Sequence, residues 1–99
     1  MRVIDGKIEG GTILTEDTQL NGMIVGVTTV SRNCILHMHG MIVGDLIVEE
    51  SATVYLNGMV NGNVTNCGGI LEVYGTVNGN ILRQKGKTFI HPNAAIRGG

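Results

Sequence analysis

The chain has 99 residues, a length that allows a single small domain. Hydrophobic residues make up 42% and aromatic residues 3%, so aliphatic side chains must form the core, and this apolar content excludes a disordered chain. The net charge of −1 gives no general attraction to phosphate, so no nucleic-acid partner is expected. Since the sequence shows neither a membrane-spanning apolar run nor a secretory leader, we expect a cytoplasmic protein without a transmembrane segment.

One seven-residue motif recurs: an apolar residue, any residue, Gly, any residue, Ile or Val, any residue, Gly. In chain order the copies are Ile4–Gly10, Leu20–Gly26, Met38–Gly44, Leu56–Gly62 and Val73–Gly79, with a weaker copy at Pro92–Gly98. A repeat of 16 to 19 residues indicates stacked turns that cover one another. We expect the repeated glycines at the corners of these turns: Gly22, Gly26, Gly40, Gly44, Gly58, Gly62, Gly75 and Gly79.

A shorter period lies inside the first one. Aliphatic residues fall six apart at Ile24, Val30, Leu36, Ile42, Val48, Val54 and Val60. Three periods of six make one turn, so each turn should hold three short strands with these side chains pointing inward. The sequence therefore predicts an all-β fold, a single three-faced β-solenoid over residues 1–99, with about six rungs of 16–19 residues.

The stacked turns should align equivalent residues into core columns. We expect Ile24, Ile42, Val60 and Val77 in one column, Leu36, Val54, Leu71 and Ile90 in a second, and Val30 and Val48 in a third. The six-residue count then puts Asn66 and Arg83 into the third column and so breaks it. Either the rung slips by one residue around Cys67-Gly68-Gly69 or the third face loosens, and the 17-residue spacing there favours the slip.

The strings Gly40-Met41-Ile42-Val43-Gly44-Asp45-Leu46, Gly58-Met59-Val60-Asn61-Gly62-Asn63-Val64 and Gly75-Thr76-Val77-Asn78-Gly79-Asn80-Ile81 share a Gly-x-Ile/Val-x-Gly-Asp/Asn-aliphatic core. This core resembles that of the bactofilins, bacterial cytoskeletal proteins that form polymers. The resemblance implies a right-handed β-helix that stacks end to end into filaments without a nucleotide.

Hexapeptide acyltransferases also repeat every six residues, but their motif usually puts Gly, Ala or an acid directly after the aliphatic residue. Here those places hold Val25, Ser31, His37, Val43, Glu49 and Tyr55. The sequence also shows no long loop, and it offers no nucleophile with a general base. We therefore expect no enzyme activity and no cofactor.

Residues beside the first core column should point outward and form a protein-binding face. Met23, Met41 and Met59 precede the core residues, while Val25 and Val43 follow them. Flexible methionines suit adaptable contacts, and a contiguous apolar patch often marks an interaction surface, although such a ladder can also simply stabilise neighbouring rungs. The expected face consists of Met23, Val25, His39, Met41, Val43, Tyr55 and Met59.

No metal site is expected. His37 and His39 should face the same way, yet no third ligand is placed beside them. Cys34 and Cys67 have neither a CxxC spacing nor a His partner at zinc-ligand spacing, so zinc is not expected, and a disulfide between them is possible but not indicated.

Two functions follow from these expectations. No capping helix is predicted at either end, and open backbone edges recruit further chains, which favours a bactofilin-like scaffold that associates with itself. Seven of the eight acids fall by residue 50 and four of the seven bases close the chain, a distribution that suits head-to-tail contact or ordinary solvation. The alternative is a stand-alone binding module, for example a toxin-neutralising immunity protein, that uses the Met/Val face.

Overall fold

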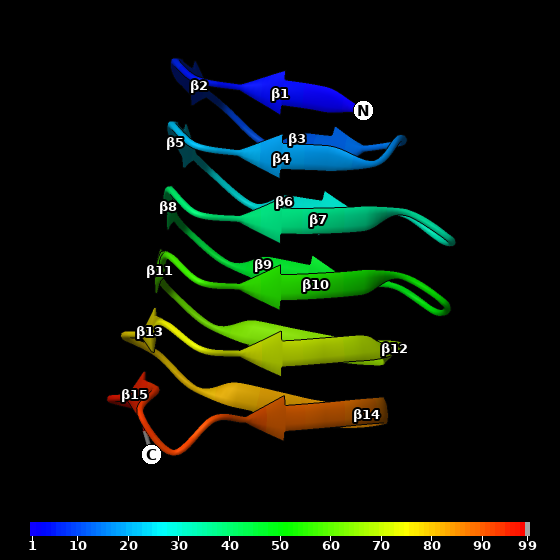
Figure 1. The fold of residues 1–99 in the computed structure, drawn as a ribbon, viewed down its shortest axis with the longest axis vertical. Helices are drawn as coiled ribbons and strands as arrows, with labels where there is room; N and C mark the ends of the chain where they lie inside the picture. Colours follow the sequence, from blue (N-terminus) through cyan, green and yellow to red (C-terminus); the bar gives the residue numbers. More distant parts are fainter. Residues whose placement is uncertain (99) are drawn as a thin grey trace.

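The computed structural model describes residues 1–98, and Gly99, the last residue of the expected domain, lies outside them. Every regular element among these residues is a β-strand, and neighbouring strands run parallel (Figure 1). The strands wind into a three-sided coil that measures 29 × 24 × 20 Å. The predicted all-β solenoid is confirmed, although the coil has about five turns where about six were predicted.

Each side of the coil is a stack of strands, one from each turn. The first side consists of β1 (Arg2–Ile4), β4 (Thr18–Leu20), β7 (Ile35–Met38), β10 (Thr53–Leu56) and the second halves of β12 (Val64–Val73) and β14 (Ile81–Ile90). The second side consists of β2 (Lys7–Glu9), β5 (Met23–Val25), β8 (Met41–Val43), β11 (Met59–Asn61), β13 (Thr76–Val77) and β15 (Ala95–Ile96). The third side consists of β3 (Thr12–Leu14), β6 (Thr28–Val30), β9 (Leu46–Val48) and the first halves of β12 and β14.

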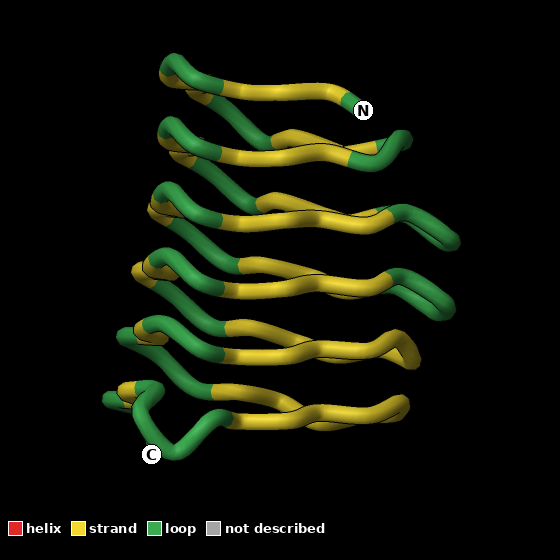
Figure 2. The backbone as a smooth tube through the Cα atoms, in the orientation of Figure 1, coloured by secondary structure: helices red, strands yellow, loops and turns green. Residues whose placement is uncertain are grey.

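The coil is right-handed. In Figure 1 the chain crosses the front leftward through β1, passes to the back at β2 and returns behind through β3. It then enters β4 one turn below β1, and the same course repeats down the stack (Figure 2). This is the hand expected of parallel strands joined within one coil, because right-twisted strands pack back in that sense.

The core column on the second side agrees with the prediction. Register aligns Ile8, Ile24, Ile42, Val60, Val77 and Ile96 one above the next. Its middle members are fully buried, whereas Ile8 and Ile96 at the two ends are only partly covered. Each complete burial of such a side chain contributes about 1.5–3 kcal/mol, and the neighbouring turns provide that burial.

The first side carries two inward columns, and the prediction for it was partly wrong. Leu36, Val54 and Leu71 align as predicted, but the next member is Thr88. Ile90 lies opposite Val73 instead, because the last two turns are 17 residues apart and not 19. It extends a second column that the six-residue period did not identify, made of Ile4, Leu20, Met38, Leu56 and Val73.

Asn66 occupies the third column and does not leave it. It pairs with Val48 above and Arg83 below, and it is fully buried. The predicted slip is present directly after it, where the register shifts on both sides of Cys67. From there on, the corner between the third and first sides is one residue shorter than in the turns above.

The Asn66 side chain organises this shorter corner. Its Oδ1 accepts hydrogen bonds from the backbone N–H groups of Gly68 at 3.1 Å and Gly69 at 2.9 Å. Its Nδ2 donates to the Lys87 carbonyl at 3.0 Å and to Thr88 Oγ1 at 3.1 Å. A buried amide is acceptable here because its donor and acceptor groups are bonded. In the two turns above, a wider corner projects instead, at residues 31–34 and 49–52 (Figure 2).

Candidate self-association and binding surfaces

Both ends of the coil present strand edges that no other strand covers within residues 1–98. At the head, defined as residues 1–17, β1, β2 and β3 pair only with the strands of the turn below. At the tail, defined as residues 81–98, β14 and β15 pair only with β12 and β13 above. Unpaired parallel edges of this kind are templates for adding another strand.

The free groups at the two edges belong to opposite sets of residues. Between internal turns, residues whose side chains point outward donate upward to carbonyls of inward residues, as Tyr74 N–H does to Leu56 O at 2.8 Å. On the head strand β1, the N–H of Arg2 donates downward to Asp17 O at 2.9 Å, so alternation points the free groups of Val3 out of the head. By the same alternation, the inward Thr88 and Ile90 point their free groups out of the tail.

Apolar side chains gather at both ends. Val3 and Ile13 at the head are 53% and 66% exposed, and Leu82 and Phe89 at the tail are 43% and 50% exposed. Behind them, the core column residues Ile8 and Ile96 are only partly covered. The hydrophobic core therefore continues up to both end surfaces without a polar cap among residues 1–98.

The corner glycine of the first turn has open space where later ones have none. A Cβ on Gly22 would overlap the carbonyl oxygen of Gly6, one turn above it. A Cβ on Gly6 would point the same way, out of the head, and would meet nothing within 4 Å. Gly6 therefore marks the place where the next turn would lie if the coil continued.

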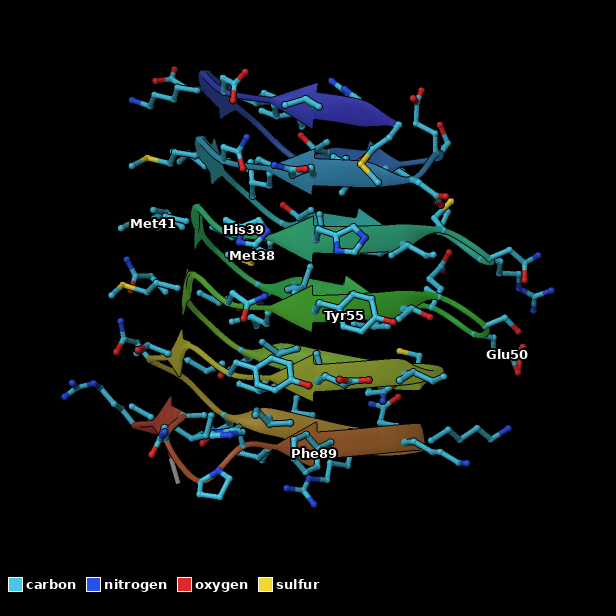
Figure 3. All side chains as sticks on the ribbon, viewed as in Figure 1. Met38, His39, Met41, Glu50, Tyr55 and Phe89 are labelled. Carbon is cyan, nitrogen blue, oxygen red and sulfur yellow. The ribbon has the colours of Figure 1, made fainter. Side chains whose placement is uncertain are left out.

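The methionines of the expected binding face form a ladder on the second side. Met23, Met41 and Met59 are in register, and all three are half-buried between neighbouring turns. Figure 3 shows the Met41 side chain directed away from the coil. Val25 and Val43 lie in the next outward column and are also half-buried. The strip is therefore an outward apolar surface that is partly covered by its own stacking.

The seven residues of the expected binding face do not share one side. His39 is exposed at the corner after β7, next to the methionine ladder. Tyr55 lies on the first side, where its ring stacks on His37 with ring centroids 5.2 Å apart. The structure thus brings His39 close to the ladder and places Tyr55 around the corner from it.

Comparison of the chain with protein-family models, curated proteins and solved structures finds no match.

All six aromatic and imidazole rings lie along the first side or at its corner, a clustering that the sequence analysis missed. They are His37, His39, Tyr55, Tyr74, Phe89 and His91. Tyr74 packs against Phe89 and His91, with centroids 6.1 and 5.6 Å apart (Figure 3 labels Tyr55 and Phe89). The 17-residue spacing that stacks Tyr74 below Asn57 and His91 below Tyr74 was the available signal.

Two titratable groups are perturbed by their surroundings. Tyr74 donates a hydrogen bond to the Glu72 carboxylate, and this bond raises the pKa of the phenol. Burial raises the pKa of the Cys34 thiol, and the nearby charges of Asp17 and Glu16 raise it further. Cys34 and Cys67 are both free, and the buried Cys34 stays protonated at neutral pH.

The described residues hold no metal-binding group of three or more His, Cys, Asp or Glu side chains. They include no helix that could span a membrane. The most prominent hollow is an open groove at the corner between the first and second sides, near the head. Its walls are formed by backbone around Gly6, Gly22 and Gly40 and by the side chains of Met23 and Met41. The upper part of the methionine ladder therefore borders a shallow groove.

Proposed function

We propose that this protein is a non-enzymatic, bactofilin-like structural protein that associates with itself through the ends of its solenoid to form polymers or scaffolds. The observation that carries the proposal is the pair of uncovered edges, each with unpaired backbone groups around an apolar core. Docking a second copy at an end would bury Val3 and Ile13, or Leu82 and Phe89, and would satisfy the free N–H and C=O groups. The sequence resemblance to polymer-forming proteins supports the same function.

The Gly6→Ala variant tests this proposal. The added methyl meets nothing inside the protomer, yet it fills the space that a docked turn needs. Light scattering and negative-stain microscopy should show polymers of the unchanged protein. For Gly6→Ala, assembly should need at least about a tenfold higher concentration, which corresponds to about 1.4 kcal/mol.

Gly11→Ala is the matched control. A Cβ there points into the protomer, at an ordinary 3.5 Å from the Val27 carbonyl oxygen. It should leave assembly unchanged. A wild-type protein that stays monomeric at high concentration would exclude polymer formation, and equal effects of the two glycine variants would exclude contact at the head.

A second candidate function is binding of another protein, such as a toxin neutralised by an immunity protein, through the methionine ladder. The in-register Met23, Met41 and Met59 beside Val25 and Val43 favour it, since no charged side chain interrupts this surface in the middle turns. Met41→Glu should abolish such binding without affecting polymers. Thr76→Glu, in the same outward column one turn below Met59, is the control that should retain binding.

A further inference from the structure

We infer that the end-to-end contact is polar: the head of one copy docks on the tail of the next, in an association that opposite charges favour and salt weakens. This inference rests on the proposed self-association and adds its direction and its dependence on ionic strength. Two independent features of the ends carry it, the charges at each rim and the set of backbone groups that each edge leaves free.

The two rims have opposite charge. The head carries four exposed carboxylates, Asp5, Glu9, Glu16 and Asp17, against the side chains of Arg2 and Lys7. The tail carries Arg83, Lys85, Lys87 and Arg97 and has no acidic residue. A head therefore faces a tail with attraction, whereas two tails would bring only cations together.

The charged groups of the head are partly fixed in place. Asp17 Oδ1 accepts a hydrogen bond from the Ile35 backbone N–H at 2.9 Å, and Asp5 Oδ1 accepts one from Asn21 Nδ2 at 2.9 Å. Of the head cations, Lys7 is already paired with Glu9 at 2.9 Å. At the tail, none of the four cations forms a salt bridge with any residue from 1 to 98. The tail cations are thus available to a second copy.

The backbone favours the same polarity. Every contact between internal turns joins an upward-pointing set of outward residues to a downward-pointing set of inward residues, as in Ile70 N–H to Ala52 O at 2.8 Å. The head leaves free the first set, represented by Val3, and the tail leaves free the second, represented by Ile90. A head on a tail therefore repeats the internal pairing, whereas two heads would present the same set to each other.

Charge reversal at each end separates polar from symmetric contacts. The head variant is Glu9→Lys with Glu16→Lys, the tail variant is Lys85→Glu with Lys87→Glu, and a third protein carries all four changes. All of these side chains are exposed, so the protomer should fold, which circular dichroism checks. A control variant, Glu49→Lys with Glu72→Lys, makes the same charge change as the head variant in the middle turns.

Sedimentation at about 20 mM NaCl measures the concentration needed for assembly. Under polar docking each single-end variant should need at least about tenfold more protein, and the four-fold variant and the control should stay within about threefold of wild type. Raising NaCl to about 500 mM shortens the screening length several-fold and should weaken wild-type assembly.

Single-end variants that assemble like wild type, a four-fold variant that does not recover, or assembly that strengthens with salt would overturn polar docking and leave self-association standing. A wild-type protein that does not assemble at all would overturn the proposed function as well.

Discussion

The corner glycines give the sharpest test of the stacked coil, and Gly58→Ala is the most informative change. A Cβ at this position would overlap the Gly40 carbonyl oxygen and would lie 2.9 Å from the His39 carbonyl carbon. Carbon atoms in contact are normally about 3.5–4.0 Å apart, so the two turns would have to separate by more than about half an ångström.

The cost of that separation follows from the bonds beside the corner. Gly58 N–H donates to Met38 O at 3.0 Å, and Met59 N–H donates to Gly40 O at 3.0 Å. Weakening both costs about 1 kcal/mol each, and the strain of overpacking adds about 1–3 kcal/mol. We therefore expect Gly58→Ala to lower the free energy of unfolding by about 3–5 kcal/mol, a large part of the total for a small domain.

Equilibrium unfolding in guanidinium chloride, followed by far-UV circular dichroism at one protein concentration, measures this change. Gly11→Ala is again the matched control, because its Cβ has ordinary contacts, and it should change the free energy of unfolding by less than about 1 kcal/mol. If both variants unfold at the same denaturant concentration, close stacking of the turns does not limit these glycines and the reasoning is wrong.

Three further predictions concern single side chains. Asn66→Leu should lower the free energy of unfolding by about 2–5 kcal/mol, since two buried backbone N–H groups lose their acceptor, as chemical denaturation can measure. Because the folded state keeps the Cys34 proton longer than the unfolded chain does, stability should fall as pH rises above about 8.5, the ordinary pKa of a thiol. Ultraviolet titration should find a Tyr74 pKa above its usual value, and Glu72→Gln should bring that pKa down.

Each of these predictions has its own control. Val48→Leu changes the residue above Asn66 without removing a hydrogen bond, so it should cost less. Cys34→Ala should abolish the part of the alkaline stability loss that comes from this thiol, and an unchanged pH profile would mean that Cys34 is not its source. Tyr55, which donates no hydrogen bond to a carboxylate within the described residues, is the reference phenol for Tyr74.

The repeat was readable from the sequence because stacking imposes the same requirement on every turn. Ile24, Ile42 and Val60 must fill the same space between similar neighbours, so their spacing identified both the three sides and the inward residues. The position of Ile90 was wrong because an apolar residue was expected below Leu71, whereas the shortened corner brings Thr88 there. A one-residue change in a corner leaves no composition signal of its own.

The binding surfaces were less predictable than the core. Burial of Asn66 depends on backbone groups of Gly69 and Lys87, which reach it only in the folded corner. Tyr55 was assigned to the methionine surface because it is close in sequence, while the corner at Gly58 separates the two sides. Outward residues are under weaker packing constraints, so their grouping depends on exact register between turns.

The exact 18-residue register of β5, β8 and β11 makes one turn a length unit of the molecule. Each turn contacts only the turn before it and the turn after it, so stability is a sum over neighbouring interfaces. A duplication of residues 41–58 would insert one more layer about 4.8 Å thick while leaving every other layer with an unchanged kind of neighbour. Rod length in such a chain is therefore open to stepwise genetic change, with the chemistry of the two terminal layers preserved.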